Sequence, residues 1–274
     1  MQRWHGLEAV PPGWGRSVVT IGVFDGVHRG HAEIIGRAVK RAREREVPSV
    51  LITFVPHPSE VVRPGSHPPV LTSIPRRAEL VAALGVDVFC ALPFTLEFSR
   101  MPADEFAHRV LVERLHATGV IVGENFRFGY KAQGDVAMLQ QLGRTFGFTA
   151  DGVELFADGD TVLSATYVRS CVQAGDVLAA AKALGRPHRV DGVVERGDQR
   201  GRELGFPTAN IVPDDRFAIP GHGVYAAFAN GVPAAVNVGV RPTFDTDLGV
   251  LIETFLIDFE GDLYGQNLRV AFVE

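Results

Sequence analysis

Residues 17–31 read SVVTIGVFDGVHRGH, and this stretch decides the fold of the first half of the chain. The β-branched run at 17–24 predicts a strand, the glycines after it predict a turn, and a helical pattern begins near Gly30 and continues to about Arg45. The same order recurs, with strands predicted at 49–54, 86–92 and 119–122 and helices predicted at 74–84, 103–115 and 135–146. Alternating strands and helices predict a mostly parallel sheet that is covered by helices on both faces.

The pattern changes at Gly185-Arg186-Pro187, which follows two predicted helices at 166–174 and 176–184. Beyond this point only short strands are predicted, at 189–195, 224–229, 234–240, 251–258 and 268–273. Asn230-Gly231 lies between two of these strands and is the strongest hairpin signal in the chain. We therefore predict an α/β domain at 1–186 and a small all-β barrel at 187–274.

Composition and charge exclude several classes of protein. The 274 residues are 46% hydrophobic and 22% charged, as in globular proteins. A net charge of −5 argues against a nucleic-acid partner, because binding to a phosphate backbone needs clustered Lys and Arg. Cys90 and Cys171 are too few for a disulfide framework, which favours a reducing, cytoplasmic setting. No leader-like segment opens the chain, and no apolar stretch is long enough to predict a membrane span. The sequence does not decide whether the chain forms a homo-oligomer.

The turn between the first strand and helix has the chemistry of a phosphate site. In an open α/β sheet this junction lies where ligands bind, and the free N–H groups of a helix N-terminus attract anions. Gly22, Gly26 and Gly30 remove side chains where a polyphosphate would touch the backbone. His28 and His31 are three residues apart and can share one helix face, from which two imidazoles can donate hydrogen bonds to phosphate oxygens. The segment therefore predicts nucleotidyl transfer rather than a solvated surface turn.

A second candidate site lies in the predicted barrel, where residues 201–211 read GRELGFPTANI. Thr208 and Asn210 are two apart in extended backbone, so they point to the same face. A hydroxyl and an amide oxygen suit a hard cation such as Mg²⁺ that is held together with ATP phosphates.

Both segments, together with 53–58 (TFVPHP), 123–129 (GENFRFG), 163–169 (LSATYVR), 237–244 (NVGVRPTF) and 252–255 (IETF), resemble the prokaryotic bifunctional riboflavin kinase/FMN adenylyltransferase (FAD synthetase) family over nearly the whole chain. The resemblance implies a Rossmann-like nucleotidyltransferase domain with a parallel sheet, followed by a small all-β barrel riboflavin-kinase-like domain. It also implies that the chain joins AMP from ATP to FMN and phosphorylates riboflavin, with Mg²⁺, and that its small-molecule partners are riboflavin, FMN and ATP.

The resemblance also assigns residues to roles. Catalytic roles fall on His28 and His31 at the ATP phosphates and on Glu253 as general base. ATP and phosphate contacts fall on Gly22, Phe24, Asp25, Gly26, Gly30, Ser164, Thr166, Arg169, Gly192 and Gly197. Flavin and substrate contacts fall on His57, Pro58, Asn125, Phe126 and Phe128, and metal contacts on Thr208 and Asn210.

Two departures from the family pattern bear on these assignments. Ala165 stands where the family commonly has a hydroxyl, so one supporting hydrogen bond is missing. The chain also stops at Glu274, where family members continue with a further loop and helix, so we expect a shortened kinase domain.

Three other functions stay open on the sequence. In the first, only the adenylyltransferase works and the barrel is a remnant. In the second, the pockets bind flavin or nucleotide without turnover, as in a sensor; intact His28, His31 and Glu253 argue against this. In the third, the nucleotidyltransferase uses a different acceptor, such as a nicotinamide or pantetheine phosphate; the segments at 53–58 and 123–129 argue against it.

Overall fold

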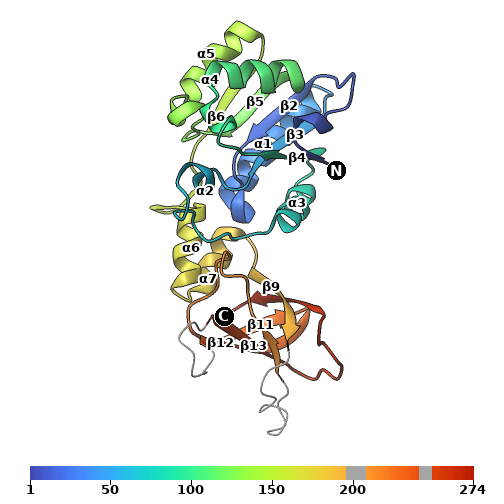
Figure 1. Ribbon diagram of the computed structural model, residues 1–274, viewed down its shortest axis with the longest axis vertical. Helices are drawn as coiled ribbons and strands as arrows, with labels where there is room; N and C mark the ends of the chain where they lie inside the picture. The colour runs from blue at the N-terminus through green and yellow to red at the C-terminus, as the bar shows by residue number, and fades with distance from the viewer. Residues whose placement is uncertain (196–207, 241–248) are drawn as a thin grey trace. The chain divides into compact units, whose positions relative to one another are not determined.

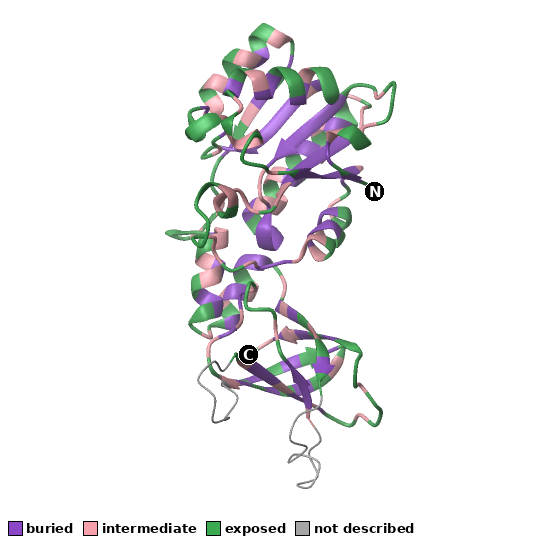
Figure 2. Cartoon of the chain, viewed as in Figure 1, coloured by how far each residue is buried: buried purple, intermediate pink, exposed green. Residues whose placement is uncertain are grey.

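The computed structural model describes residues 1–195, 208–240 and 249–274, and the chain forms two compact units (Figure 1). The first unit contains Met1–Pro68 and Ser73–Leu163, and the second contains Pro69–Thr72 and Ser164–Glu274. Each unit has its own hydrophobic core, and Figure 2 shows that the strands carry most of the buried residues. The units divide at Ser164, whereas 187 was expected to begin the second domain; two helices are thereby grouped with the barrel.

The first unit is built on a six-stranded, wholly parallel sheet in the order β1-β4-β3-β2-β5-β6. Its strands are β1 (Gln2–His5), β2 (Ser17–Ile21), β3 (Ser49–Val55), β4 (Val88–Pro93), β5 (Ala117–Gly123) and β6 (Thr149–Val153). Its helices are α1 (Arg29–Glu44), α2 (Pro58–Val62), α3 (Ile74–Ala83), α4 (Ala103–Phe106) and α5 (Val136–Phe146). A π-helical segment, η4 (Ala107–Arg114), continues α4, and short turns occupy Leu7–Ala9, Asp25–Val27, Phe98–Arg100 and Tyr130–Ala132. A small hairpin joins β7 (Ala157–Asp158) to β8 (Thr161–Val162).

Both faces of this sheet are covered because alternate side chains of each strand point to opposite sides. Val19 and Ile21 pack in one core with residues of α4, η4 and α5. Leu51 and Phe89 pack in another with residues of α1 and α3, and Val18 packs with α1 as well. The predicted parallel sheet with helices on both faces is therefore confirmed.

The second unit contains a closed barrel in the order β10-β13-β12-β11-β14-β9, with antiparallel pairing throughout. Its strands are β9 (His188–Glu195), β10 (Ala209–Ile211), β11 (Gly223–Ala229), β12 (Val232–Val240), β13 (Val250–Leu256) and β14 (Asn267–Phe272). Two helices, α6 (Ala165–Gln173) and α7 (Val177–Leu184), precede it. Every predicted barrel strand is present to within two residues at each end, so the small barrel is confirmed.

The Asn230-Gly231 hairpin forms as predicted between β11 and β12. Asn230 has φ 49° and Gly231 has φ 88°, so both central residues are in the left-handed region that a type I′ turn requires. The hairpin is thus set by local sequence.

Several features differ from the sequence prediction, among them helix α2 and the β7–β8 hairpin, which were not predicted. Strands β1 and β6 were not predicted, and the second half of the helix expected at 103–115 has the wider hydrogen-bond pattern of a π-helix, in which Leu115 donates to Val110. None of these differences changes the order of layers around the sheet.

Candidate functional site

Three of the segments singled out in the sequence follow adjacent strands of the sheet. The loop at 22–28 follows β2, the segment at 56–58 follows β3, and Glu124-Asn125 follows β5. These strands are neighbours in the order β3-β2-β5, and parallel strands end at the same edge. Chain connections turn in opposite directions on either side of β2, so this edge is the switch point where ligands bind in open α/β sheets.

The loop after β2 has an unusual backbone. Phe24, Gly26 and Val27 have φ values of 51°, 76° and 41°. A left-handed conformation is rare for a β-branched residue such as Val27, and it persists only where surrounding contacts hold it. Phe24 and Val27 are both buried in the core beside α1, which supplies those contacts. Such stored strain is typical of functional loops.

His28 begins helix α1 and His31 stacks on it. The ring of His28 is the N-cap, and its Nδ1 accepts a hydrogen bond of 3.3 Å from the backbone N–H of His31. Accepting at Nδ1 places the proton of a neutral ring on Nε2. The two rings lie 3.6 Å apart between centroids with an interplanar angle of 26°, and Phe24 meets His31 edge-on at 5.2 Å. The two imidazoles therefore form one group beside the helix N-terminus, as the spacing predicted.

The glycines of this loop have different local reasons. Gly26 needs its positive φ, which is unfavourable for residues with a Cβ. A Cβ at Gly30 would come within 3.1–3.3 Å of the His28 ring and of Phe156, so glycine there lets the imidazole lie against the helix. A Cβ at Gly22 would meet the ring of Phe24 at 3.1 Å.

Arg77 is a site residue that sequence reasoning missed. It lies on α3, and its guanidinium donates to the Val23 carbonyl at 2.8 Å, to Thr53 Oγ1 at 3.1 Å and to Asp25 Oδ1 at 3.0 Å. The side chains of Arg77 and Asp25 are only 4% and 3% exposed. This buried ion pair fixes the loop that precedes the histidines to the end of β3.

The predicted flavin residues lie at the ends of β3 and β5. His57 caps α2, and its Nδ1 lies 2.7 Å from Ser59 Oγ; Pro58 is the first residue of that helix. Asn125 is exposed beyond the end of β5. Phe128 is buried in the core and stacks on Phe126 at 5.5 Å. Their role in flavin binding stays a prediction.

These rings continue into aromatic residues that were not predicted as site residues. Phe106 contacts both Phe128, at 5.8 Å, and Phe98, at 6.1 Å. Phe98 in turn contacts Phe54 and Phe94 at 6.2 and 5.6 Å. Phe54 and Phe94 lie near the carboxyl ends of β3 and β4. An aromatic residue at the carboxyl end of a predicted parallel strand is the sequence feature that could have identified them as site residues.

Ser164, Thr166 and Arg169, the other predicted phosphate residues, lie at or in α6 of the second unit. The hydroxyl of Ser164 caps α6 by accepting from the Tyr167 N–H at 3.1 Å. Arg169 Nε donates to the Pro69 carbonyl at 2.6 Å. Their contact with phosphate stays a prediction.

The barrel places Glu253 of β13 between two asparagines on neighbouring strands. Its register partners are Asn210 on β10 and Asn237 on β12, and cross-strand partners share one face of the sheet. Asn237 Nδ2 donates to Glu253 Oε2 at 2.9 Å. Asn210 is 8% exposed, and its Oδ1 accepts no hydrogen bond from any residue that the structure describes. Thr208, half-buried, directly precedes β10.

Two predicted ATP-binding glycines belong to this region. Gly192 lies in β9, where a Cβ would collide with the Ile211 side chain, so packing alone requires glycine there. Gly197 lies outside the described residues.

Residues 11–167 match the family model of FAD synthetase, and residues 184–274 match that of riboflavin kinase. The chain is 38% identical to a bifunctional riboflavin kinase/FMN adenylyltransferase of Pseudomonas fluorescens, over 99% of this chain and 88% of that protein. It is 35% identical to the enzyme of the same name from Escherichia coli K12, over 97% and 86% of the two chains.

A crystal structure from Streptococcus pneumoniae, described as a macrolide-efflux protein, has a TM-score of 0.90 and 29% identity and covers 100% of this chain and 90% of that one. No helix among the described residues is long and apolar enough to cross a membrane. The two family models and the relatives agree with the resemblance seen in the sequence, and the chain belongs to the bifunctional riboflavin kinase/FMN adenylyltransferase family.

Proposed function

We propose that the chain makes FAD in two steps: it phosphorylates riboflavin with ATP to give FMN and ADP, and it joins AMP from a second ATP to FMN, releasing pyrophosphate. The observation that carries the proposal is the stacked pair His28 and His31 at the N-terminus of α1, at the switch point of a parallel sheet. The adenylyltransferase is assigned to 1–186 and the kinase to 187–274.

In the adenylyl transfer, a phosphate oxygen of FMN attacks the α-phosphorus of ATP, and the bond to the pyrophosphate leaving group breaks. Such a reaction needs positioning and charge stabilisation more than covalent catalysis. The N-terminal N–H groups of α1 present positive potential to the triphosphate. The hydrogen bond accepted at His28 Nδ1 places the proton of the neutral ring on Nε2, and we assign this N–H as a donor to a phosphate oxygen, with the ring of His31 stacked beside it.

The flavin end of the reaction is proposed along the aromatic residues of the first unit. Phe54, Phe94 and Phe98 contact one another edge-on or tilted at 5.5–6.2 Å and are partly exposed. Aromatic faces suit a planar isoalloxazine ring, which gains from stacking as well as from area burial. His57 and Asn125, at the ends of β3 and β5, provide polar groups close to these strands.

In the kinase reaction, the terminal ribityl hydroxyl of riboflavin attacks the γ-phosphorus of ATP, and Glu253 takes the hydroxyl proton. Asn237 holds the carboxylate in place through its hydrogen bond to Oε2, which leaves Oε1 to accept the proton. The Asn210 carbonyl oxygen is buried and accepts from no described residue, which fits a ligand to a hard cation. Thr208 and Asn210 would therefore hold Mg²⁺, which neutralises phosphate charge when bound.

The test supplies purified protein and MgATP with either riboflavin or FMN, and separates flavins by chromatography. The proposal expects FMN and FAD from riboflavin, and FAD with pyrophosphate from FMN. FAD formed from FMN alone would leave only the adenylyltransferase, and binding of flavin and ATP without turnover would indicate a sensor. If FMN gives no FAD, other phosphorylated acceptors become the substrates to screen.

A variant separates the two sites. Asn210→Ala should abolish FMN formation from riboflavin and leave FAD formation from supplied FMN unchanged. Loss of both activities in a folded variant would contradict separate sites.

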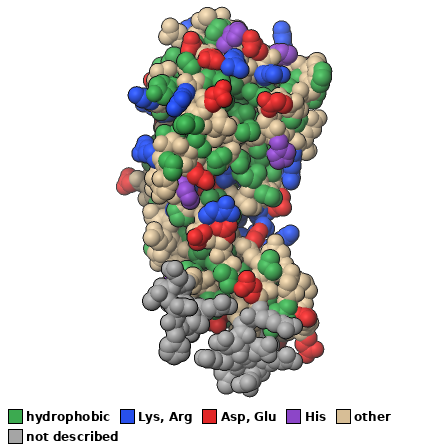
Figure 3. Space-filling view, in the orientation of Figure 1, with side chains coloured by type: hydrophobic (Ala, Val, Ile, Leu, Met, Phe, Trp, Pro, Cys, Tyr) green, Lys and Arg blue, Asp and Glu red, His purple; other side chains and the backbone are tan. Residues whose placement is uncertain are grey.

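These substrates and the absence of a disulfide among the described residues support a cytoplasmic location, which fractionation of the native cells would test. On the face drawn in Figure 3, basic and acidic side chains are interspersed, which agrees with small-molecule partners rather than nucleic acid.

A further inference from the structure

A basic cavity lies at the edge of the sheet opposite to the histidine pair. It has a volume of about 640 Å³ and opens where strands β2, β5 and β6 begin. Helix α1 starts at the histidines and ends at this cavity, so its 16 residues separate the two places by roughly 24 Å. The cavity is therefore distinct from the proposed nucleotide site.

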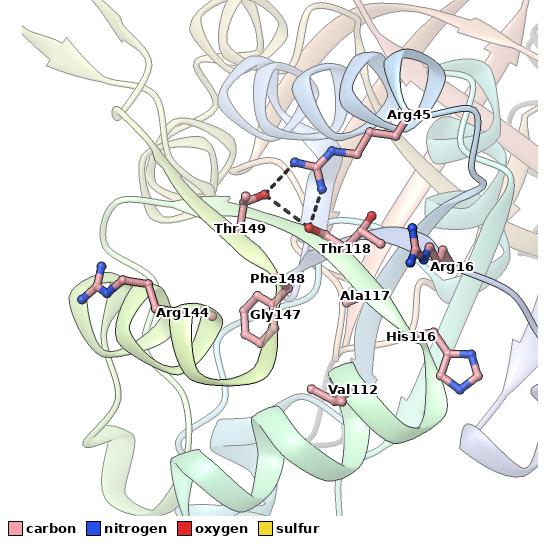
Figure 4. A pocket seen from close by; sticks show the side chains of 11 residues that line it. Arg16, Arg45, Val112, His116, Ala117, Thr118, Arg144, Gly147, Phe148 and Thr149 are labelled. Atoms are coloured by element: carbon pink, nitrogen blue, oxygen red, sulfur yellow. Dashed lines mark hydrogen bonds between the residues drawn. The ribbon is translucent and has the colours of Figure 1, made fainter.

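Basic side chains from four segments line this cavity (Figure 4). Arg16 precedes β2, Arg45 follows α1, His116 precedes β5, and Arg144 lies in the last turn of α5. No aspartate or glutamate is among the described residues that line it. Of the carboxylates nearby in the chain, Asp151 pairs with Arg41 at 3.1 Å, and the exposed Glu46 directly follows Arg45.

Arg45 is held in place before any ligand arrives. Its guanidinium donates to the Thr118 carbonyl and, at 3.0 Å, to Thr149 Oγ1, as Figure 4 shows. A Cβ at Gly119 would lie 3.2 Å from Arg45 Nη1, so a glycine on β5 lets the guanidinium lie against the sheet. A half-buried arginine fixed in this way loses little side-chain freedom on binding an anion.

The other basic side chains of the cavity are less constrained by hydrogen bonds than Arg45 is. Arg16 and Arg144 are exposed and make no ion pair within the described residues. His116 Nδ1 lies 2.6 Å from the Trp14 carbonyl, which can only accept, so Nδ1 carries a proton and Nε2 is the second polar atom of the ring.

Helix polarity does not cancel this charge. Three helical segments, α1, η4 and α5, end beside the cavity, and each C-terminus contributes about half a negative charge. Together these give roughly −1.5, against the full charges of Arg16, Arg45 and Arg144. Among the residues that line the cavity the net charge is therefore positive, and the preference for arginine at helix C-termini explains only part of it.

We propose that this cavity binds a small phosphate-bearing polyanion. Arginine pairs with phosphate through two parallel hydrogen bonds, and the volume is that of a small-molecule site. Phe148, Val112 and Ala117 give the cavity apolar lining between its basic groups. A phosphate ester with a compact apolar body therefore fits better than the inorganic ion.

The two tryptophans of the chain make the binding measurable. Trp14 and Trp4 contact each other at 4.8 Å, and the Trp14 carbonyl contacts His116. Titration with inorganic pyrophosphate should change tryptophan emission, and calorimetry should detect the same binding; both are measured with saturating ATP, so that the proposed nucleotide site, which releases pyrophosphate as a product, is already occupied. Potassium chloride at equal ionic strength should give neither signal. If the ligand is a phosphate ester, phenyl phosphate should bind more tightly than inorganic phosphate. If the ligand is the inorganic ion, the two should bind with equal affinity.

The double variant Arg16→Gln/Arg144→Gln should weaken pyrophosphate binding at least about tenfold, because it removes two of the charge-assisted contacts. Both side chains are exposed, so the fold should survive, as far-UV circular dichroism would check. Arg37→Gln is the matched control, since Arg37 is an exposed arginine of α1 that pairs with Glu33, and it should bind as the parent does. An unchanged affinity in the double variant, an equal effect of chloride, or no binding up to roughly 10 mM, which corresponds to less than about 3 kcal/mol, would overturn the proposal.

Discussion

Arg77 holds the loop in front of the histidine pair, and replacing it with methionine should destabilise the first unit by about 3–5 kcal/mol. The guanidinium is almost fully buried and makes hydrogen bonds with Val23, Thr53 and Asp25. Methionine has a similar length but offers none of these donors. The Asp25 carboxylate would then be buried without the cation that faces it, which is the costly part of breaking a buried ion pair.

Urea unfolding that is followed by tryptophan emission measures this loss directly, because both tryptophans lie in the first unit. With an m value of about 2 kcal/mol per molar, the midpoint should fall by about 2 M. The neighbouring Arg76 provides the control, since its ion pair with Glu79 is at the surface of the same helix. Arg76→Met should cost less than about 1 kcal/mol.

A double variant tests the cause. Asp25→Asn removes the charge that Arg77→Met leaves behind, so the two changes together should cost less than Arg77→Met with Asp25 intact. If Arg77→Met unfolds with the same midpoint as Arg76→Met, the pair does not hold the loop and the account of this site is wrong.

Four shorter predictions follow from other parts of the chain. His31→Ala should lower the rate of FAD formation from FMN by about 10²–10³-fold while riboflavin phosphorylation is unchanged, as flavin chromatography would measure. Glu253→Gln should abolish riboflavin phosphorylation and leave the rate of FAD formation from FMN unchanged. Equal losses in both reactions would contradict the role of Glu253 as the general base of the kinase. Gly231→Ala should lower the free energy of unfolding of the barrel by about 1–2 kcal/mol, because φ is 88° at this position and alanine disfavours it; unfolding followed by far-UV circular dichroism would measure the loss. The unfolding transition that tryptophan emission reports, in the first unit, should not change. Burial alone would raise the pKa of Asp87, but hydrogen bonds, chiefly from Arg43, outweigh it and leave the pKa below its ordinary 3.8. A depressed folded-state pKa adds stability that is present above pH 3.8 and lost as the pH falls through the folded value, so Asp87→Asn should show a smaller change in urea midpoint between about pH 6 and about pH 3.

The parts of the fold that the sequence predicted are those with a local cause. The strand and helix in 17–45 were found because a β-branched run, glycines and helical periodicity are all properties of neighbouring residues. The Asn230-Gly231 turn was found because two successive positive φ angles suit those residue types. The stacking of His28 and His31 followed from a spacing of three at a helix start.

The parts that were missed depend on partners distant in the sequence. Strand β1 has one buried residue, Trp4, and is a strand because it pairs with β4 at the edge of the sheet. Strand β6 contains Asp151 and Gly152, which disfavour strands, and is held by pairing with β5. Arg77 looks like a solvent-facing residue of an amphipathic helix, yet it is buried because the loop at 23–25 comes to it. In each case the residues that determine pairing or burial lie far away in the sequence, so the neighbouring residues carry no signal of them.

Helix α1 explains why the two ends of the sheet need different side chains for the same kind of ligand. At its N-terminus the backbone supplies about half a positive charge and free N–H groups, so the two imidazoles need only refine the position of an anion. At its C-terminus the backbone supplies negative potential, so an anion can bind only where side chains reverse the sign. Arg45 lies at that end, with Arg16 and Arg144 beside the same cavity. The number of arginines at the second place is thus what helix polarity requires if a phosphate is to bind there, and a phosphate that bound equally well without Arg16 and Arg144 would show that the polarity argument is wrong.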